Sequence, residues 1–304
     1  YAMGHNPANN MPLWIKPAGK VSVKDVADVM RDHYEGTPMD MTQDIGAGGN
    51  ALPYRWRPMG FTYDGKEYTN ERAIATQQTA FWFVGQSRGN YPDVLGGIIW
   101  FGTDDAATSY VTPIYTNSEI VPECFREGNG DMLTYSSTSS FWLNNRVANA
   151  CYKMYNYMAP FVREHIDRFE NSQISEGVPQ TDAKALELYN DIAEKEMKKQ
   201  SKKNPGYDPM TDTGDAFLQV KQYLTSYSVS TADAIFSAWK KMEETLLVKF
   251  IDGNVKAQNE DGTFVHSPES ESIPDGLTQP GYTEYWKEAV AHFHGDVVKK
   301  VEAE

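Results

Sequence analysis

The sequence is poor in cysteine, because its 304 residues include only Cys124 and Cys151. Two cysteines cannot build a disulfide framework, and they argue against a zinc site made of thiolates. A single bridge is the most that they allow. Cys151 shares its spacing with apolar residues and is expected in the core. Cys124 follows Pro122 and Glu123 in a loop, where its thiol would be reactive only beside a base.

Positive charge is also scarce. Lys and Arg number 28 against 42 Asp and Glu, which gives a net charge of -14. Because binding to phosphate needs clustered Lys and Arg, this balance argues against nucleic acids and anionic membrane surfaces as partners. The sequence also has no run of roughly 18 uncharged apolar residues, the length that a membrane-spanning helix needs.

The first residues carry no targeting signal. A secretory peptide needs a basic start and an apolar core, and YAMGHNPANNMPLW has neither. The chain starts at Tyr1, and Met3 stands just before a Gly-His-Asn-Pro stretch. We interpret it as a truncated or processed piece of a longer protein, so its localisation, cytoplasmic or exported, stays open.

A helix is predicted over 22–35. Ser22 and Asp25 form the S-x-x-D capping pattern that begins a helix, and apolar residues recur on one face as far as His33. Gly36 ends the pattern. The segment 37–60 is rich in Gly and Pro and is predicted to be a loop, with GAGGN as its most flexible part.

The region 61–118 has the texture of β-structure. An Asp64-Gly65 pair inside FTYDGKEY predicts a hairpin turn. Three apolar segments follow that are predicted to be strands buried on at least one face. They are AIATQQTAFWFVGQ, GGIIWFGTD and SYVTPIYT.

The remainder is predicted to be mostly helical, which makes the chain an α+β protein. From Phe141 onward one apolar stripe continues past Pro160, which should kink or divide the helix. A charged helix over 183–203 and a linker over 202–215 come next. Three more helices are expected, over 215–225, after a cap formed by Ser230 and Asp233, and from about 282.

The stretch RDHYEG at 31–36 concentrates functional side chains but lacks the spacing of a metal site. Asp32 and Glu35 stand one and two positions from His33, whereas ligands on one helix face are three or four apart. His292 and His294 diverge in the same way. We therefore expect no metal site in either place.

Other reaction signatures are equally weak. The adjacent Asp104 and Asp105 are more simply a turn than the separated carboxylates of a glycosidase. G-x-S-x-G is absent, and no Ser-His-Asp order can be argued from the six histidines. The residues alone therefore stop short of naming a reaction.

Six stretches between residues 11 and 156 resemble, in consistent order, the cysteine dipeptidase family that also includes the secernins. They are MPLWIKP with VSVKDVADVMRDHYEGTPMDMT, PYRWRP, NERAIATQQTAFWFVGQSR, GGIIWFGTDDAATSYVTPIY, VPECFREGNGDML and FWLNNRVANACYKMYN. RDHYEG lies within the first of them and is the clearest label of the family.

The resemblance implies an N-terminal-nucleophile hydrolase with a four-layer αββα sandwich that cleaves dipeptides without a metal or organic cofactor. Residues 1–175 would then be the C-terminal part of the catalytic domain, and 176–304 a mostly helical extension packed on it. In that class the mature chain begins with Cys, and its α-amine, with a pKa of about 8, takes the proton of its thiol.

The chain departs from this family pattern at the nucleophile. Tyr1 stands at its start, and both cysteines are internal. The resemblance therefore implies a C-terminal portion that is inactive alone. Its expected partners are a dipeptide substrate and the missing N-terminal part of the same enzyme, and a homo-oligomer is a further possible assembly.

The resemblance also suggests which residues support the site. In related amidases an arginine on a core strand stabilises the thiolate, and Arg72 is the candidate for that role, with Asn70 as an oxyanion or substrate donor. The alternative is that Arg72 pairs with Glu67 or Glu71 at a strand edge.

Five further residues are candidates for substrate binding. Gln77 and Gln78 cannot both face the core of a strand, so one of them is expected to line the pocket. Arg31, Asp32 and His33 are expected to buttress the pocket from the preceding helix.

A binding module is the alternative from another class of function. It would stack sugars or peptides on exposed aromatic rings and would have no catalytic role. This hypothesis requires Trp56, Trp82, Trp100 and Trp142 to be exposed.

Overall fold

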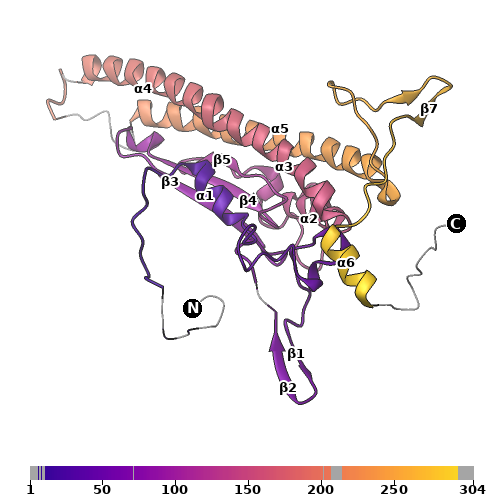
Figure 1. The fold of residues 1–304 in the computed structure, drawn as a ribbon. Helices are drawn as coiled ribbons and strands as arrows, with labels where there is room; N and C mark the ends of the chain where they lie inside the picture. Colours follow the sequence, from indigo (N-terminus) through magenta and orange to yellow (C-terminus); the bar gives the residue numbers. More distant parts are fainter. Residues whose placement is uncertain are drawn as a thin grey trace.

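The computed structural model describes residues 6, 8, 11–70, 72–200, 202–206 and 214–293. It is an α+β fold, as expected, in which a three-stranded sheet lies beneath two long helices, α4 (Val178–Gln200) and α5 (Asp215–Lys249) (Figure 1). No helix in the described ranges combines the length and apolarity needed to cross a membrane.

The central sheet is antiparallel with the order β3 (Phe81–Ser87), β4 (Gly97–Thr103), β5 (Thr112–Tyr115). Alternate residues point to opposite faces. Trp82 and Trp100 are buried on the face that packs against the helices, whereas Phe81 and Phe83 are more than half exposed on the other. One face of the sheet is therefore apolar and uncovered.

The first predicted strand is only half correct. AIATQQTAFWFVGQ forms a strand from Phe81 onward, but residues 73–80 form turns. The amide of Ala75 donates to the carbonyl of Asp32 (3.1 Å), and that of Thr79 donates to Thr76 (3.1 Å). These bonds tie the segment to the RDHYEG loop and leave it without a partner strand.

Helix α1 (Val23–Met30) has the predicted start but ends earlier than predicted. The capping box is complete, since Asp25 N donates to Ser22 Oγ (3.2 Å) and Ser22 N donates to the Asp25 carboxylate (2.8 Å). The helix ends because the Asp32 carboxylate accepts the amide of Tyr34 (2.6 Å), whose φ is positive. Residues 31–36 are therefore a loop, and the expected helical position of His33 is wrong.

The glycine-rich segment is also more ordered in form than expected. Ile45–Asn50 is a short 3-10 helix, η1, whose first turn is capped by the Asp44 carboxylate (3.0 Å to Ala47 N). Helix α6 (Glu284–Phe293) packs on it. A Cβ at Gly49 would lie 2.5 Å from the Tyr282 ring, so glycine permits this close approach.

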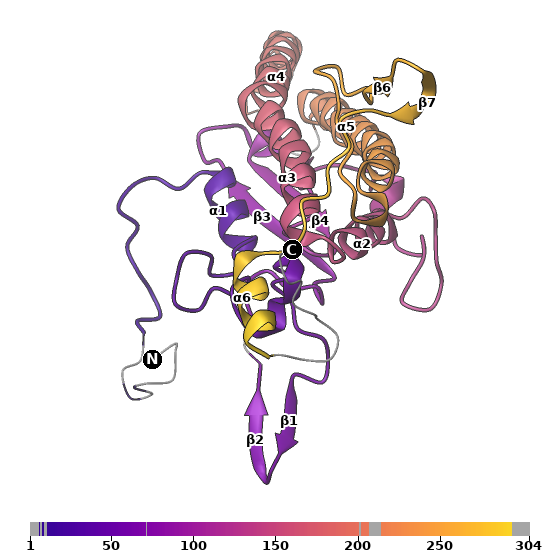
Figure 2. The ribbon, with the colours of Figure 1, turned by 45° about the vertical axis from the view of Figure 1, so that its right-hand side comes forward.

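The predicted Asp64-Gly65 hairpin is confirmed as β1 (Gly60–Tyr63) and β2 (Lys66–Thr69). Both turn residues have positive φ, as a tight hairpin turn requires. The hairpin projects from the rest of the structure (Figure 2), and all eight strand residues are exposed.

The helices confirm the apolar stripes but correct two boundaries. The chain breaks between α2 (Ser140–Cys151) and α3 (Tyr155–Ser172), not at Pro160, which lies inside α3. Helix α5 is continuous where two helices were expected. The Ser230 hydroxyl bonds back to the Tyr227 carbonyl (3.2 Å) inside α5 and caps nothing.

Six short elements complete the described fold. A π-helix, η4 (Gln173–Gly177), joins α3 to α4. The 3-10 helices η2 and η3 flank β4 and β5, η5 follows α5, and a small hairpin precedes α6. Their bounds are η2 Asp93–Leu95, η3 Glu123–Phe125, η5 Ile251–Gly253, β6 His266–Ser267 and β7 Ser270–Pro274.

Candidate functional site

The RDHYEG loop is fixed to the core by Arg31. Its guanidinium makes a bidentate ion pair with Glu170 of α3 (2.6 and 3.0 Å). It also donates to the carbonyls of Ala106 (2.9 Å) and Ser109 (3.1 Å). Arg31 and Glu170 are both almost fully buried. This contact set gives Arg31 a structural role, and its predicted role in substrate binding stays a prediction.

His33 begins a line of buried hydrogen bonds. Its Nδ1 lies 2.9 Å from the Glu35 carboxylate, and its Nε2 lies 2.8 Å from the Tyr54 hydroxyl. The Tyr54 hydroxyl in turn donates to Asp105 Oδ1 (2.7 Å). Partial burial raises the pKa of Glu35, but hydrogen bonds from His33 outweigh it and lower that pKa to about 2. Glu35, which lies at the outer end of this line beside His33, is therefore an ionised carboxylate.

Asp105 lies at the inner end of this line and accepts three hydrogen bonds. The donors are the hydroxyls of Tyr54 and Tyr152 (2.7 and 3.1 Å) and the amide of Ala107 (3.0 Å). Its side chain is fully buried, and burial raises its pKa despite these bonds. Burial and the charge of Asp105 also raise the pKa of Tyr54 and Tyr152, so both phenols remain protonated donors.

Asp104 directly follows β4 and also has a strongly raised pKa. Burial, with a smaller contribution from Asp105, raises its pKa to about 7 despite a hydrogen bond from Asn145 (3.0 Å). Its Oδ2 is buried without a hydrogen-bond partner among the described residues, and its φ is +66°. A carboxyl group with a pKa near neutrality can exchange a proton at physiological pH, which is the requirement for general acid–base work.

The residues predicted from the Arg72 region do come together. The Arg72 guanidinium and Arg57 (3.3 Å) both donate to the side-chain oxygen of Gln78, and Gln77 donates to the Arg55 carbonyl (2.6 Å). Asn70 closes the base of the β1–β2 hairpin through its amide. None of the four lies on a strand, which corrects the expected strand positions.

The alternative for Arg72 was an ion pair with Glu67 or Glu71, and only Glu67 lies among the described residues. The Arg72 guanidinium bonds to Gln78, and it has no ion pair with Glu67 in the described part of the chain. Glu71, like Tyr1 and His294, lies outside the described residues. The crevice between Arg72 and Tyr54 holds only about 10 Å³, so the loop packs closely on residues 53–55.

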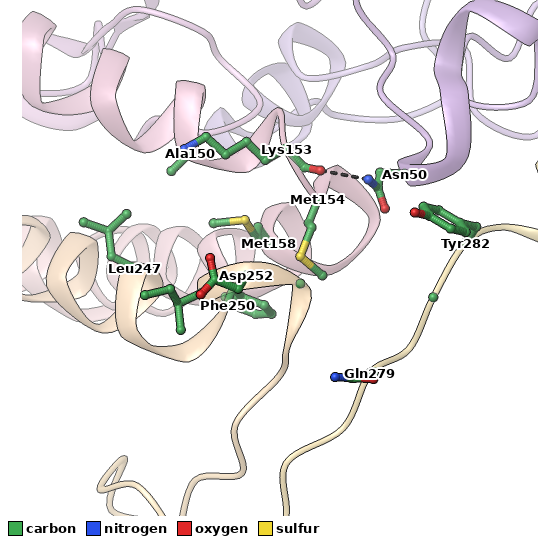
Figure 3. Close-up of a pocket in the computed structure, with 13 residues that line it drawn as sticks. Asn50, Ala150, Lys153, Met154, Met158, Leu247, Phe250, Asp252, Gln279 and Tyr282 are labelled. Atoms are coloured by element: carbon green, nitrogen blue, oxygen red, sulfur yellow. Dashed lines mark hydrogen bonds between the residues drawn. The ribbon is translucent and has the colours of Figure 1, made fainter. Parts of the chain in front are cut away.

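Two larger cavities are partly lined by residues of α3. One, of about 560 Å³, opens beside His33, Glu35 and Tyr155. The other, of about 880 Å³, lies between α2, α3 and the end of α5 and is floored by Met154 and Met158 (Figure 3). None of the predicted site residues lines this larger cavity.

Both cysteines are buried. Burial raises the pKa of Cys124 to about 12, and burial with the nearby Asp105 raises that of Cys151 as well. Neither thiol would ionise at neutral pH, so neither meets the requirement for a nucleophile. Cys151 lies in the core, as expected.

The binding-module hypothesis loses two of its four aromatic rings. Trp82 and Trp100 are buried against the helices, and the Trp100 indole donates to Gln86 (3.1 Å). Trp142 is half-buried, and only Trp56 is more than half exposed. A continuous aromatic platform from these four residues is therefore wrong.

Sequence reasoning missed the role of Asp104 and Asp105, which it interpreted as a simple turn. The only signal in the sequence was that both acids directly follow the apolar strand segment GGIIWFGT. A turn at the end of a strand is normally expected to face solvent, so this position alone did not indicate burial. It also missed Tyr54 and Tyr152. Nothing in their local sequence distinguishes them from the other tyrosines, because their partners are distant in the chain.

Sequence comparisons with known proteins place this chain in a family. The chain is similar to "Probable dipeptidase B" of Lactococcus lactis subsp. lactis (strain IL1403), with 26% identity over 144 residues that cover 47% of this chain and 26% of that protein. It is similar to "Probable dipeptidase" of Latilactobacillus sakei, with 26% identity over 141 residues, 46% of this chain and 25% of the relative. "Probable dipeptidase A" of Streptococcus pyogenes serotype M3 (strain SSI-1) is 25% identical over 146 residues, 47% and 26% of the two chains.

The matched segment thus spans about a quarter of the length of each of these relatives. The sequence model of peptidase family C69 matches residues 2–168, which is more than half of the chain and includes RDHYEG, Arg72 and the Asp104–Asp105 turn. The chain belongs to peptidase family C69.

Proposed function

We propose that this chain is the C-terminal portion of a cysteine-type dipeptidase whose nucleophile, an N-terminal Cys, lies outside it. Membership of a peptidase family and the dipeptidase names of its relatives support the activity. The observation that carries the finer proposal is the burial of Cys124 and Cys151, whose raised pKa values disqualify both thiols. Alone, the chain should be inactive.

The proposed reaction is acyl transfer. The α-amine of the external Cys takes the thiol proton, and the thiolate attacks the peptide carbonyl of a dipeptide. The carbon–nitrogen bond breaks, the leaving amine receives the proton, and a thioester remains. Water then hydrolyses the thioester, which releases the second amino acid and restores the thiol.

The uncovered face of the sheet supports a partner within the same enzyme. Phe81 and Phe83 of β3 are 59% and 53% exposed, and Ile99 of β4, which pairs with Gly85, lies on the same face. Exposed apolar patches of this kind mark contact surfaces. We propose that the remaining, N-terminal part of the dipeptidase packs a second sheet here, which would complete the αββα sandwich.

In this arrangement the residues of the present chain act in support. Arg72 and Asn70 are proposed to stabilise the thiolate and the oxyanion, and Gln77 or Gln78 to contact the dipeptide. Arg72 is exposed and its guanidinium contacts a neutral amide, so it remains free to pair with an anion. The Asp32 carbonyl accepts the amide of Ala75 and the Tyr34 hydroxyl donates to the Arg72 carbonyl, so residues on either side of His33 hold the segment that carries Arg72.

Hydrolysis of dipeptides by the longer polypeptide, with this chain joined to the residues that precede it, tests the proposal. Replacing its N-terminal Cys by Ser should abolish hydrolysis, whereas Cys124→Ala and Cys151→Ala should leave the rate within about twofold once corrected for the folded fraction. Loss of activity in a folded Cys124→Ala variant, with the N-terminal replacement silent, would refute the assignment of the nucleophile.

A further inference from the structure

The larger cavity, of about 880 Å³, is built from two helix ends and one chain crossing. Helix α2 ends at Cys151 and α5 ends at Lys249, and the segment 279–282 passes across the opening. The floor is apolar, since Met154, Met158 and Phe250 are all less than 10% exposed. This composition suits a flexible apolar side chain, because methionines adapt their shape to what they contact.

Two opposite charges stand at the rim of this cavity. Lys153 follows α2, and Asp252 follows α5. In Figure 3 Lys153 lies along the α2 side and Asp252 on the α5 side, with Met158 between them. Neither side chain forms an ion pair or a side-chain hydrogen bond with any residue that the structure describes. Both charges are therefore available to a ligand.

The backbone fixes the two charged residues on opposite sides of the cavity. Helix α5 ends at Lys249, and its last carbonyls accept hydrogen bonds from the backbone amide and the ammonium of Lys256. The carboxylate of Asp252, three residues further on, is the free negative charge that the described residues place on this side of the cavity. A ligand cation is therefore favoured on the Asp252 side. On the other side, the Lys153 carbonyl is held by the Asn50 amide (2.8 Å), which fixes the backbone that carries the ammonium group.

We propose that this cavity binds a zwitterionic α-amino acid with a branched or long apolar side chain, such as leucine. The side chain lies on Met154, Met158 and Phe250, the carboxylate faces Lys153, and the ammonium faces Asp252. This site is separate from Arg72 and the Asp104–Asp105 turn. Although dipeptide hydrolysis would release such ligands, the proposal does not depend on that activity, because binding is measured without turnover.

The geometry predicts weak but charge-selective binding. Both charged groups are exposed, so each contact with the ligand is expected to change the affinity by about fivefold to tenfold. Burial of one leucine side chain supplies the rest of the affinity, which places the dissociation constant on the order of millimolar.

Titration of the chain with methyl-¹³C methionine labels tests the site. The probes are L-leucine, L-leucinamide, which lacks the carboxylate, and N-acetyl-L-leucine, which lacks the ammonium. Leucine should shift the methyl signals of Met154 and Met158, assigned with Met→Leu variants, and the two blocked probes should bind about fivefold to tenfold more weakly.

Two variants assign each charge to its partner. Lys153→Gln should weaken leucine binding about fivefold to tenfold but leave leucinamide binding unchanged. Asp252→Asn should weaken leucine binding and leave N-acetyl-L-leucine unchanged. Asn tolerates the left-handed conformation of residue 252 (φ +55°), so this variant should fold. Lys198→Gln, on the exposed face of α4, is the matched control.

Two results would overturn the proposal. One is the absence of any chemical-shift change in the methyl groups of Met154 and Met158 at a leucine concentration on the order of 50 mM, which is about 50 times the expected dissociation constant. The other is equal binding of leucine and of N-acetyl-L-leucinamide, which carries neither charge. That second result would instead indicate a cavity for a buried side chain of another polypeptide segment.

Discussion

Arg31 and Glu170, 139 positions apart in the chain, form a bidentate ion pair in the core that fixes the RDHYEG loop to helix α3. Both are less than 6% exposed. Arg31→Met would leave the Glu170 carboxylate buried without its charge partner, and we expect the free energy of unfolding to fall by about 3–5 kcal/mol. Urea unfolding measures this change.

The control for this prediction is Arg168→Met on helix α3, the helix that also carries Glu170. Arg168 pairs with Glu164, but both side chains are exposed, and exposed pairs contribute at most about 1 kcal/mol. Equal effects of the two variants would contradict the structural role of Arg31.

Asp104 should make the protein less stable as pH rises. Its pKa is about 7 in the folded state and about 3.8 in the unfolded chain, so the folded state binds the proton more tightly. The stabilisation is fully present below pH 3.8 and is lost as pH rises through 7. Asp104→Asn should therefore gain stability over the native chain between pH 4 and 8, up to roughly 4 kcal/mol.

Asn suits position 104 because it keeps the acceptor for Asn145 and tolerates a positive φ. Asp64→Asn is the matched control, since Asp64 also has a positive φ but is exposed. Thermal unfolding at several pH values measures both. If Asp104→Asn raises the stability by the same amount at every pH, ionisation of Asp104 is not the cause of the gain.

Tyr54→Phe should loosen the contact between the RDHYEG loop and the end of β4. The change removes one donor from Asp105 and one partner from His33, both buried, and should cost about 1–3 kcal/mol of stability. Amide hydrogen exchange at Ala107, which also bonds to Asp105, should accelerate. Tyr63→Phe, on the exposed hairpin, should change neither quantity.

The strands and helices could be predicted from sequence wherever one apolar face repeats. The hairpin turn, the capping box of α1 and the apolar stripes of α2, α3 and α5 all depend on neighbours within a few residues. The end of α1 could not be predicted in this way. It depends on the Arg31–Glu170 pair and on the Asp32–Tyr34 bond, and Glu170 has no signal near residue 31.

In the candidate site, too, features set by nearby residues could be predicted, and features set by residues distant in the chain could not. The resemblance selected Arg72, Gln77 and Gln78, which do cluster, but it placed them on a strand because the loop partner Asp32 was unknown. Asp104 and Asp105 were interpreted as a turn because burial cannot be read from two adjacent acids. The partners of Asp105 are Tyr54 and Tyr152, each about 50 positions away, and that of Asp104 is Asn145.

The uncovered face of the sheet gives a separate prediction. Phe83→Ser should change the stability of this chain by less than about 0.5 kcal/mol, because Phe83 is already 53% exposed. It should weaken association with the proposed N-terminal part by at least about tenfold, since a buried Phe contributes about 1.5–3 kcal/mol. Ile273→Ser, at 50% exposure in β7, is the control and should leave association unchanged.

The central claim is that the nucleophile of this peptidase lies outside the chain. The most direct measurement is the rate of dipeptide hydrolysis by the chain alone and after mixing with a companion segment that begins with Cys. The account predicts no hydrolysis by the chain alone and a measurable rate with the companion, which Cys→Ser in that companion abolishes. Hydrolysis by the lone chain, lost in the Cys124→Ala or Cys151→Ala variant, would contradict it.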